Sequence, residues 1–252
     1  MTTTDDDLWI RRFHPAPDAG ARLVCLPHAG GSASYYHPVS AALSPAIDVL
    51  AVQYPGRQDR RAEPCVENIE ELADGIVGAL RPWTDRPFAL FGHSMGAVLG
   101  FEVTRRLERE DIAPLMLFAS GRRAPSTRRA ESVHLRDDDG LVAELKRLNG
   151  TDSSVLADEE LLRMVLPATR SDYRAIETYA GDPGAVLNTP ITVLTGDNDP
   201  KTTLDEARAW SGHTTGEFEM RVYPGGHFFL TRHARRINAE LTRFFAERKS
   251  LI

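Results

Sequence analysis

Short apolar runs alternate with amphipathic segments along most of the chain. Apolar runs typical of buried strands occupy residues 21–26, 47–53, 88–91, 114–120, 190–195 and 218–223. Segments with the apolar spacing of a surface helix follow four of these runs, at residues 34–43, 66–81, 96–108 and 229–248. This repeated order of strand and helix predicts an α/β fold in which helices cover both faces of a mostly parallel central sheet.

The alternation is interrupted between residues 121 and 188, where no strand pattern occurs. Two helical patterns, at residues 138–148 and 158–179, lie there among charged loops. Because the segment follows the helix at 96–108 and precedes the next sheet strand, it should lie over the carboxyl ends of the strands. We therefore predict one α/β domain over residues 1–252, with a helical lid insertion at 121–188. A packing subdomain far from any site is the alternative.

The composition is that of a globular protein. Of 252 residues, 42% are hydrophobic and 26% are charged, and no apolar run approaches the roughly 20 residues of a membrane helix. The N-terminus is polar and acidic, without the apolar run of a secretion signal, so we expect a cytoplasmic protein. The net charge of −6 gives no sign of nucleic-acid binding. Two cysteines, with no Cys/His cluster of zinc-site spacing, predict neither a disulfide framework nor a bound metal.

Arginines are concentrated in two short stretches. They are Arg57, Arg60 and Arg61 in one stretch, and Arg122, Arg123, Arg128 and Arg129 in the other. Such groups are typical of solvated loops. The alternative interpretation is a docking surface for an acidic partner, because complementary charge steers the encounter of two proteins.

The run at 88–91 is followed at once by GHSMG, in which Ser94 stands at the centre of a G-x-S-x-G spacing. The two glycines leave room for a sharp strand-to-helix turn around the serine. The helix that follows directs its positive end and the Met95 amide toward negative charge developing beside the serine oxygen. The spacing also occurs by chance in unrelated proteins. The flanking strand and closely packing helix favour a nucleophile elbow, with Ser94 as the nucleophile.

Residues 27–31 (PHAGG) form a glycine-rich loop directly after the first predicted strand. In hydrolases with a nucleophile elbow, the loop after an early strand supplies the second amide of the oxyanion hole. Glycines let such a backbone approach the substrate closely. We therefore predict that the amides of Ala29 and Met95 form the oxyanion hole, and a turn without a chemical role is the alternative.

Two further polar residues lie at predicted strand ends. Asp199 follows the strand at 190–195 within GDNDP, and His227 follows the strand at 218–223 within PGGH. Serine needs a nearby base at neutral pH, and that base needs a carboxylate to hold its tautomer. His227 is therefore predicted to take the proton from Ser94, and Asp199 to orient His227. Their order along the chain is that of the α/β-hydrolase fold.

Other residues compete for these two roles. Asp197 is only two residues from Asp199, but the spacing after Gly196 places Asp199 beyond the turn, where Pro200 stiffens it. Four histidines compete with His227. His28 and His93 are expected to shape the pocket, His213 to lie in a polar loop and His233 to lie in the terminal helix.

Five motifs occur together in a fixed order. They are PHAGG at residues 27–31, QYPGR at 53–57, GHSMG at 92–96, GDNDP at 196–200 and GGHFF at 225–229. In this combination, which spans nearly the whole chain, the sequence resembles the type II thioesterases of polyketide and nonribosomal peptide synthesis. The helical segment at 121–188 looks like the lid of that family.

The resemblance implies a discrete α/β-hydrolase that removes acyl groups from the phosphopantetheine arm of an acyl carrier protein or peptidyl carrier domain. Such an enzyme clears aberrant or stalled units from a synthase. By the same resemblance the catalytic residues are Ser94, Asp199 and His227, and the oxyanion amides belong to Ala29 and Met95, in agreement with the residue-based assignment. The chemistry needs no cofactor or metal, because an activated serine attacks a thioester and the thiol leaves readily.

Three other functions are compatible with these residues. A general serine esterase or peptidase could use the same scaffold, because the three residues do not select the leaving atom. An acyltransferase would pass the acyl group to an alcohol or amine, as in cyclising thioesterases, but those normally occur fused to a synthase. A non-catalytic protein that binds acyl chains or carrier domains is the third alternative.

Overall fold

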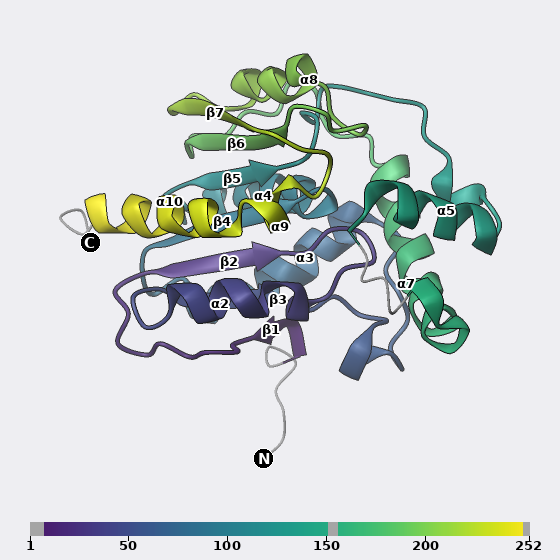
Figure 1. Cartoon of the computed structure of the whole chain (residues 1–252). Coiled ribbons are helices and arrows are strands. Elements are labelled where there is room, and N and C mark those ends of the chain that lie inside the picture. Colours follow the sequence, from purple (N-terminus) through teal and green to yellow (C-terminus); the bar gives the residue numbers. More distant parts are fainter. Residues whose placement is uncertain (1–7, 151–155, 249–252) are drawn as a thin grey trace.

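Figure 1 shows the computed structural model of the chain, in which residues 8–150 and 156–248 are described. A seven-stranded sheet runs through its centre in the order β1-β3-β2-β4-β5-β6-β7. The strands are β1 (Ile10–Arg11), β2 (Arg22–Leu26), β3 (Asp48–Val52), β4 (Phe88–His93), β5 (Leu117–Ser120), β6 (Ile191–Gly196) and β7 (Phe218–Tyr223). β1 pairs antiparallel with β3, and the other neighbouring strands pair in parallel. The carboxyl ends of β2 to β7 therefore meet along one edge of the sheet.

Helices cover both faces of this sheet, as the sequence pattern predicts. In Figure 1, α2 and α10 lie in front of the strands, and α3 and α4 lie behind them. The helices are α2 (His37–Leu43), α3 (Ile69–Leu80), α4 (Met95–Glu108), α5 (Asp138–Leu148), α7 (Glu159–Thr178), α8 (Leu204–Arg208), α9 (Phe229–Arg232) and α10 (Ala234–Glu247). In the described residues, no helix is long and apolar enough to cross a membrane.

Alternate residues of a strand face the two helix layers. Leu23 and Cys25 of β2 belong to an apolar cluster that includes residues of α2 and α10, whereas Val24 and Leu26 belong to one that includes α3 and α4. β2 to β6 are buried along their whole length. Strands that are covered on both faces need apolar side chains at successive positions, and this is why they appear in the sequence as continuous apolar runs.

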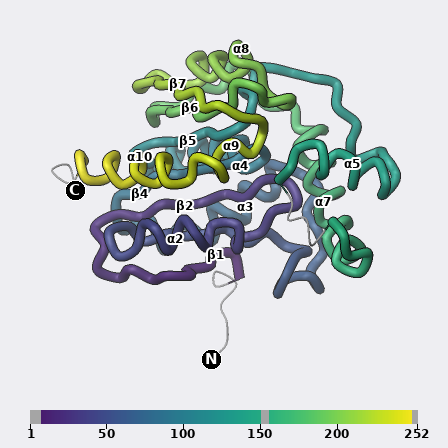
Figure 2. Tube along the Cα trace, in the orientation of Figure 1, coloured from purple at the N-terminus to yellow at the C-terminus, as the bar shows by residue number. Residues whose placement is uncertain are grey.

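α5 and α7 lie together beyond the carboxyl ends of the strands (Figure 1). In Figure 2 the chain leaves β5, passes through these two helices and returns to the sheet at β6. Each helix begins after an aspartate, Asp137 or Asp158, whose side chain accepts hydrogen bonds from the first turn. The helices share an apolar cluster of their own, which contains Val133, Leu141, Leu145, Leu166 and Tyr173. The segment at 121–188, apart from residues 151–155, which are not described, thus lies beside the strand ends.

The predicted elements are present, and several of their ends differ by a few residues. The strand predicted at 88–91 continues to His93, and the one predicted at 114–120 begins at Leu117. The single terminal helix predicted at 229–248 is wrong, because the structure divides it at His233 into α9 and α10. The sequence pattern did not predict β1 or α8, since both are too short for a period to be recognised.

Candidate active site

Ser94 lies between β4 and α4 in a backbone conformation that non-glycine residues rarely adopt. Its φ is +54° and its ψ is −115°. The flanking glycines permit this turn, because a Cβ on Gly92 would lie 2.0 Å from the carbonyl oxygen of Gly96. The Ser94 amide donates a hydrogen bond of 2.8 Å to the carbonyl oxygen of Ser120 at the end of β5. The sharp strand-to-helix turn predicted from the glycine spacing is therefore present.

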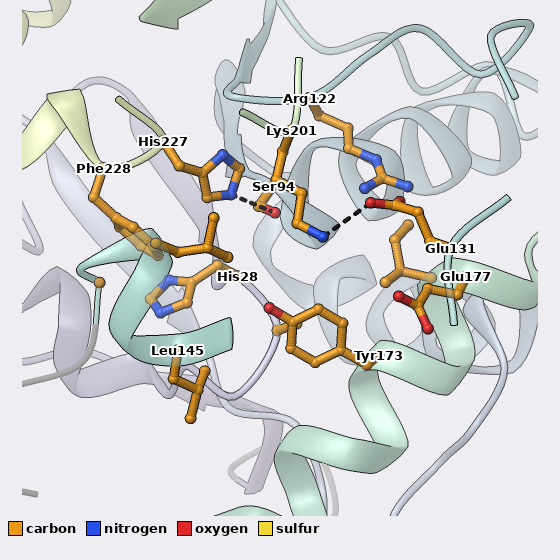
Figure 3. Close-up of a pocket in the computed structure, with 14 residues that line it drawn as sticks. His28, Ser94, Arg122, Glu131, Leu145, Tyr173, Glu177, Lys201, His227 and Phe228 are labelled. Atoms are coloured by element: carbon orange, nitrogen blue, oxygen red, sulfur yellow. Dashed lines mark hydrogen bonds and ion pairs between the residues drawn. The ribbon is translucent and has the colours of Figure 1, made fainter. Parts of the chain in front are cut away.

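The structure brings the three polar residues from different strand ends into one hydrogen-bonded chain. Oγ of Ser94 lies 3.0 Å from Nε2 of His227 (Figure 3). Nδ1 of His227 lies 3.0 and 2.9 Å from the two carboxylate oxygens of Asp199. Both partners of this pair are buried, and the Lys201 amide donates to Oδ1 of Asp199 at 2.8 Å. This arrangement can hold the His227 tautomer whose Nε2 accepts a proton from Ser94.

Asp197, the competing acid, has different partners. Its carboxylate accepts a hydrogen bond of 2.9 Å from the Gly225 amide and one of 2.8 Å from the Asn198 side chain. Gly225 lies two residues before His227, so Asp197 braces the loop that carries the histidine. The spacing argument that favoured Asp199 agrees with this geometry.

The PHAGG loop lies directly against the turn at Ser94. A Cβ on Gly96 would lie 2.0 Å from the carbonyl oxygen of Leu26 and 2.8 Å from that of Pro27. Ala29 borders the same cavity as Ser94, and Met95 is the first residue of α4. The loop and the helix that carry the two predicted oxyanion amides therefore meet at the serine, and the binding role of these amides stays a prediction.

A buried ion pair fastens the PHAGG loop to α7. The carboxylate of Asp172 lies 2.6 and 2.8 Å from the two terminal nitrogens of Arg57. It also accepts a hydrogen bond of 2.8 Å from the Gly30 amide, while Arg57 donates one of 2.9 Å to the carbonyl oxygen of Gly31. The loop beside Ala29 is thus held by a residue that the sequence reasoning missed. Asp172 lies within an amphipathic helical pattern, where an aspartate is typical of the solvent face.

Replacing Asp172 with alanine should destabilise the protein by about 3–5 kcal/mol, because Arg57 would remain buried without its partner. The catalytic rate should fall as well, since the Gly30 amide loses its acceptor next to Ala29. Urea unfolding and steady-state kinetics measure the two effects. The matched control is Arg174→Gln, which changes another residue of α7 and breaks a solvent-exposed ion pair with Glu67. It should lower the free energy of unfolding by less than about 1 kcal/mol. Equal stability losses in the two variants would contradict the proposed clamp.

His28 and His93 lie near His227 and remain neutral. Burial and the charge of His227 lower the pKa of His28 to about 3, and the same causes lower the pKa of His93 well below its usual value. The ring centroid of His93 lies 5.0 Å from that of His227. A protonated His227 therefore meets no second imidazolium charge from these two rings at neutral pH. His28 lines the cavity beside Ser94, as expected for a pocket-shaping residue, whereas His93 is fully buried and is not among the lining residues.

A buried ion cluster joins the insertion to the loop that carries Asp199. Nζ of Lys201 lies 2.9 Å from Glu131 and 2.8 Å from Glu144 of α5, and Glu131 also lies 2.5 Å from Arg123. Burial raises the pKa of both carboxyl groups, but the neighbouring cations outweigh it and lower each pKa to about 2. The carboxylates therefore stay ionised at neutral pH and neutralise the Lys201 ammonium.

Lys201 and Glu131 of this cluster border a small cavity beside Ser94. Its volume is about 30 Å³, which has room for very few water molecules. The lining combines Ser94 and His227 with apolar and aromatic residues of the insertion, which include Leu145, Leu148, Tyr173 and Ile176. The insertion therefore covers the serine in this structure.

The expectation that the arginines occupy solvated loops is wrong for four of them. Arg57, Arg60, Arg122 and Arg123 are buried. Arg61 and Arg128 are exposed, and Arg129 is partly exposed and pairs with Glu206. Since burial removes most of these charges from the surface, a docking surface made from them would be much less basic than the sequence suggests.

Comparison with known proteins gives consistent matches. The sequence matches the Thioesterase domain family over residues 21–245. It is 59% identical over 243 residues to the probable cadicidin biosynthesis thioesterase of Streptomyces griseus. The aligned residues make up 96% of this chain and 67% of that protein. It is 56% identical over 228 residues to thioesterase PikA5 of Streptomyces venezuelae, and these residues make up 90% of this chain and 81% of that protein.

Solved structures with the same fold include two from biosynthetic pathways. The type II thioesterase BorB from the borrelidin cluster superposes with a TM-score of 0.90 and 54% identity, over 96% of this chain and 99% of that one. RedJ, a thioesterase of the prodiginine pathway in Streptomyces coelicolor, gives a TM-score of 0.85 and 36% identity, over 92% and 88% of the two chains. The α/β-hydrolase fold predicted from the sequence, with helices on both faces of a mostly parallel sheet, is confirmed.

Proposed function

Because the chain belongs to the Thioesterase domain family, we propose that it is a type II thioesterase that hydrolyses acyl thioesters on the phosphopantetheine arm of carrier proteins. The names of its relatives, which are biosynthetic thioesterases, support polyketide or nonribosomal peptide synthesis as the setting. The observation that carries the proposed chemistry is the hydrogen-bonded chain from Ser94 through His227 to Asp199 beside a covered cavity.

In the first half of the proposed reaction, Ser94 forms a bond to the carbonyl carbon of the thioester. Nε2 of His227 takes the serine proton as this bond forms, and Asp199 stabilises the resulting imidazolium. The carbonyl oxygen becomes an oxyanion, which accepts hydrogen bonds from the amides of Ala29 and Met95. In other enzymes, removing one such donor raises the barrier by about 2.7–4 kcal/mol.

In the second half, the tetrahedral intermediate collapses and the carbon–sulfur bond breaks. His227 donates its proton to the departing sulfur, so that the carrier arm leaves as a free thiol. Water then attacks the acyl group on Ser94, with His227 again acting as the base. The products are a carboxylic acid and the regenerated serine, and no cofactor takes part.

The insertion at 121–188 acts as the lid of this single α/β domain. Its residues Leu145, Tyr173 and Ile176 border the cavity beside Ser94, and the cavity of about 30 Å³ is too small for a pantetheine chain. Binding of the carrier arm therefore requires the insertion to move away from the strand ends. Once closed, it excludes water that would compete for the polar groups of the site.

The choice of a thioester over an oxygen ester is the property that separates this function from a general esterase. One acyl group is presented both as a pantetheine thioester and as the oxygen ester of the corresponding alcohol, and kcat/KM is measured for each. A clear preference for the thioester supports the proposal. Efficient cleavage of the oxygen ester with slow release from the thioester would assign the chain to the general esterases.

A further inference from the structure

Arg122 is a buried cation that borders the cavity beside Ser94. Only 7% of the residue is exposed, and Figure 3 draws it among the residues that line the cavity together with Ser94 and His227. Arg122 lies two residues after Ser120, the last residue of β5. Ser120 pairs with His93, which ends β4 directly before Ser94. The strand order therefore places this arginine beside the reacting group, on the side of the loop after β5.

The guanidinium of Arg122 has no hydrogen-bond or ion-pair partner among residues 8–150 and 156–248, and its Nε is buried without an acceptor. The backbone of the residue is engaged, because its carbonyl oxygen accepts a hydrogen bond of 2.8 Å from Nε1 of Trp210. The other cation in the cavity wall is different, since Lys201 lies between two carboxylates. A charge of this kind, buried and unpaired, is costly unless a ligand supplies the missing acceptors.

The two carboxylates that face Arg122 from neighbouring elements are already occupied. Glu131 binds Arg123 and Lys201. Glu177 of α7 accepts hydrogen bonds from the backbone amides of Val133 and His134, at 3.0 and 3.1 Å, and binds the ring of His134. Burial and the charge of Arg123 lower the pKa of Arg122 to about 9, so it is still protonated at neutral pH.

We propose that Arg122 binds a carboxylate carried by the acyl group, so that short carboxyacyl thioesters, the monothioesters of dicarboxylic acids, are substrates of this enzyme. This inference rests on the proposed function and specifies its substrate class. A carboxylate offers two oxygens to the planar guanidinium, which is the geometry of a bidentate pair. The carrier phosphate is a poorer candidate, because the whole pantetheine chain separates it from the thioester, whereas Arg122 and Ser94 border one small cavity.

The test compares acyl groups of equal shape and different charge. Malonyl and isovaleryl form one pair and succinyl and 4-methylpentanoyl another, since in each pair an isopropyl group replaces the carboxylate. All four are presented as pantetheine thioesters, which lack the phosphate. In Arg122→Met, the ratio of kcat/KM for the carboxyacyl thioester to that for its neutral partner should fall at least about tenfold in one or both pairs. Arg128→Gln, which changes an exposed arginine of the same loop, should leave both ratios unaltered.

The melting temperature gives a second readout. If Arg122 is kept for binding, its replacement by methionine removes an unpaired buried charge, and Tm should stay the same or rise. A lower Tm, together with an equal fall in kcat/KM for the charged and the neutral thioesters, would show a structural role for Arg122 and overturn the inference. The inference is also overturned if neither ratio changes. A further comparison uses phosphopantetheine thioesters of the same acyl groups: if Arg122→Met lowers kcat/KM for these alone, the phosphate is the ligand and the inference is wrong.

The wild-type protein separates this inference from the proposed function. If the wild-type protein hydrolyses the two neutral thioesters but neither the malonyl nor the succinyl thioester, the inference is wrong and the thioesterase function still stands. Failure to hydrolyse any of the four thioesters, with oxygen esters cleaved, would remove the proposed function and this inference with it.

Discussion

Replacing Ser94 with alanine lowers kcat for a carrier-borne acyl thioester by at least about 10⁴-fold, because the reaction loses the atom that bonds to the carbonyl carbon. Residual release reflects only direct attack by water within the site. The strained backbone at Ser94 belongs to the turn rather than to the hydroxyl, so alanine keeps the geometry of the elbow and the fold. Single-turnover kinetics with acylated carrier measure the rate, and Tm checks the fold.

A covalent serine probe makes the assignment specific. A fluorophosphonate should label the wild-type protein once, on the peptide that contains Ser94, and should not label Ser94→Ala. Ser34→Ala serves as the matched control, because Ser34 is exposed and binds only Gln58 among the described side chains. Its activity should equal that of the wild type. Undiminished turnover or labelling in Ser94→Ala would show that another residue is the nucleophile.

Replacing Asp199 with asparagine should lower kcat by about 10⁴-fold. Both carboxylate oxygens contact Nδ1 of His227, and one of them also accepts the Lys201 amide. An amide group cannot satisfy all of these donors, because its nitrogen would face an N–H group unless the histidine takes the other tautomer. In that tautomer Nε2 carries the proton and cannot accept one from Ser94.

Asp197→Asn is the matched control for this prediction. The side chain lies in the same loop, and an amide oxygen can still accept the hydrogen bond from the Gly225 amide. Its kcat should therefore stay within about threefold of the wild type, since a single exposed hydrogen bond contributes little. The reverse result, with Asp197→Asn inactive and Asp199→Asn active, would move the acid role to Asp197.

The residues of the site could be predicted because they lie at strand ends. In a parallel sheet the carboxyl ends of the strands meet at one edge, so a serine, an aspartate and a histidine that follow three different strands are brought together by the topology alone. The glycines at 92 and 96 are a second indication of the turn. A Cβ at either position would lie 2.0 Å from a backbone carbonyl oxygen, so only glycine fits there. Both signals are local in the sequence, and both agree with the structure.

The support of the site could not be predicted, because it depends on pairs that are distant in the sequence. Arg57 and Asp172 are 115 residues apart, and each lies in a stretch whose composition is typical of the surface. Burial of an arginine depends on its finding a carboxylate, and neither periodicity nor spacing reports such a partner. The same limit applies to Arg123, which the sequence placed in a solvated loop and which the structure buries against Glu131.

The most direct test of this account follows the mass of an acylated carrier protein during incubation with the enzyme. The account predicts that the carrier loses its acyl mass and returns to the free-thiol form with the wild-type protein, and retains the acyl group with Ser94→Ala. A matched oxygen ester on the same arm should be released more slowly. A carrier that keeps its acyl group while the oxygen ester is cleaved, or that is deacylated equally by Ser94→Ala, would contradict it.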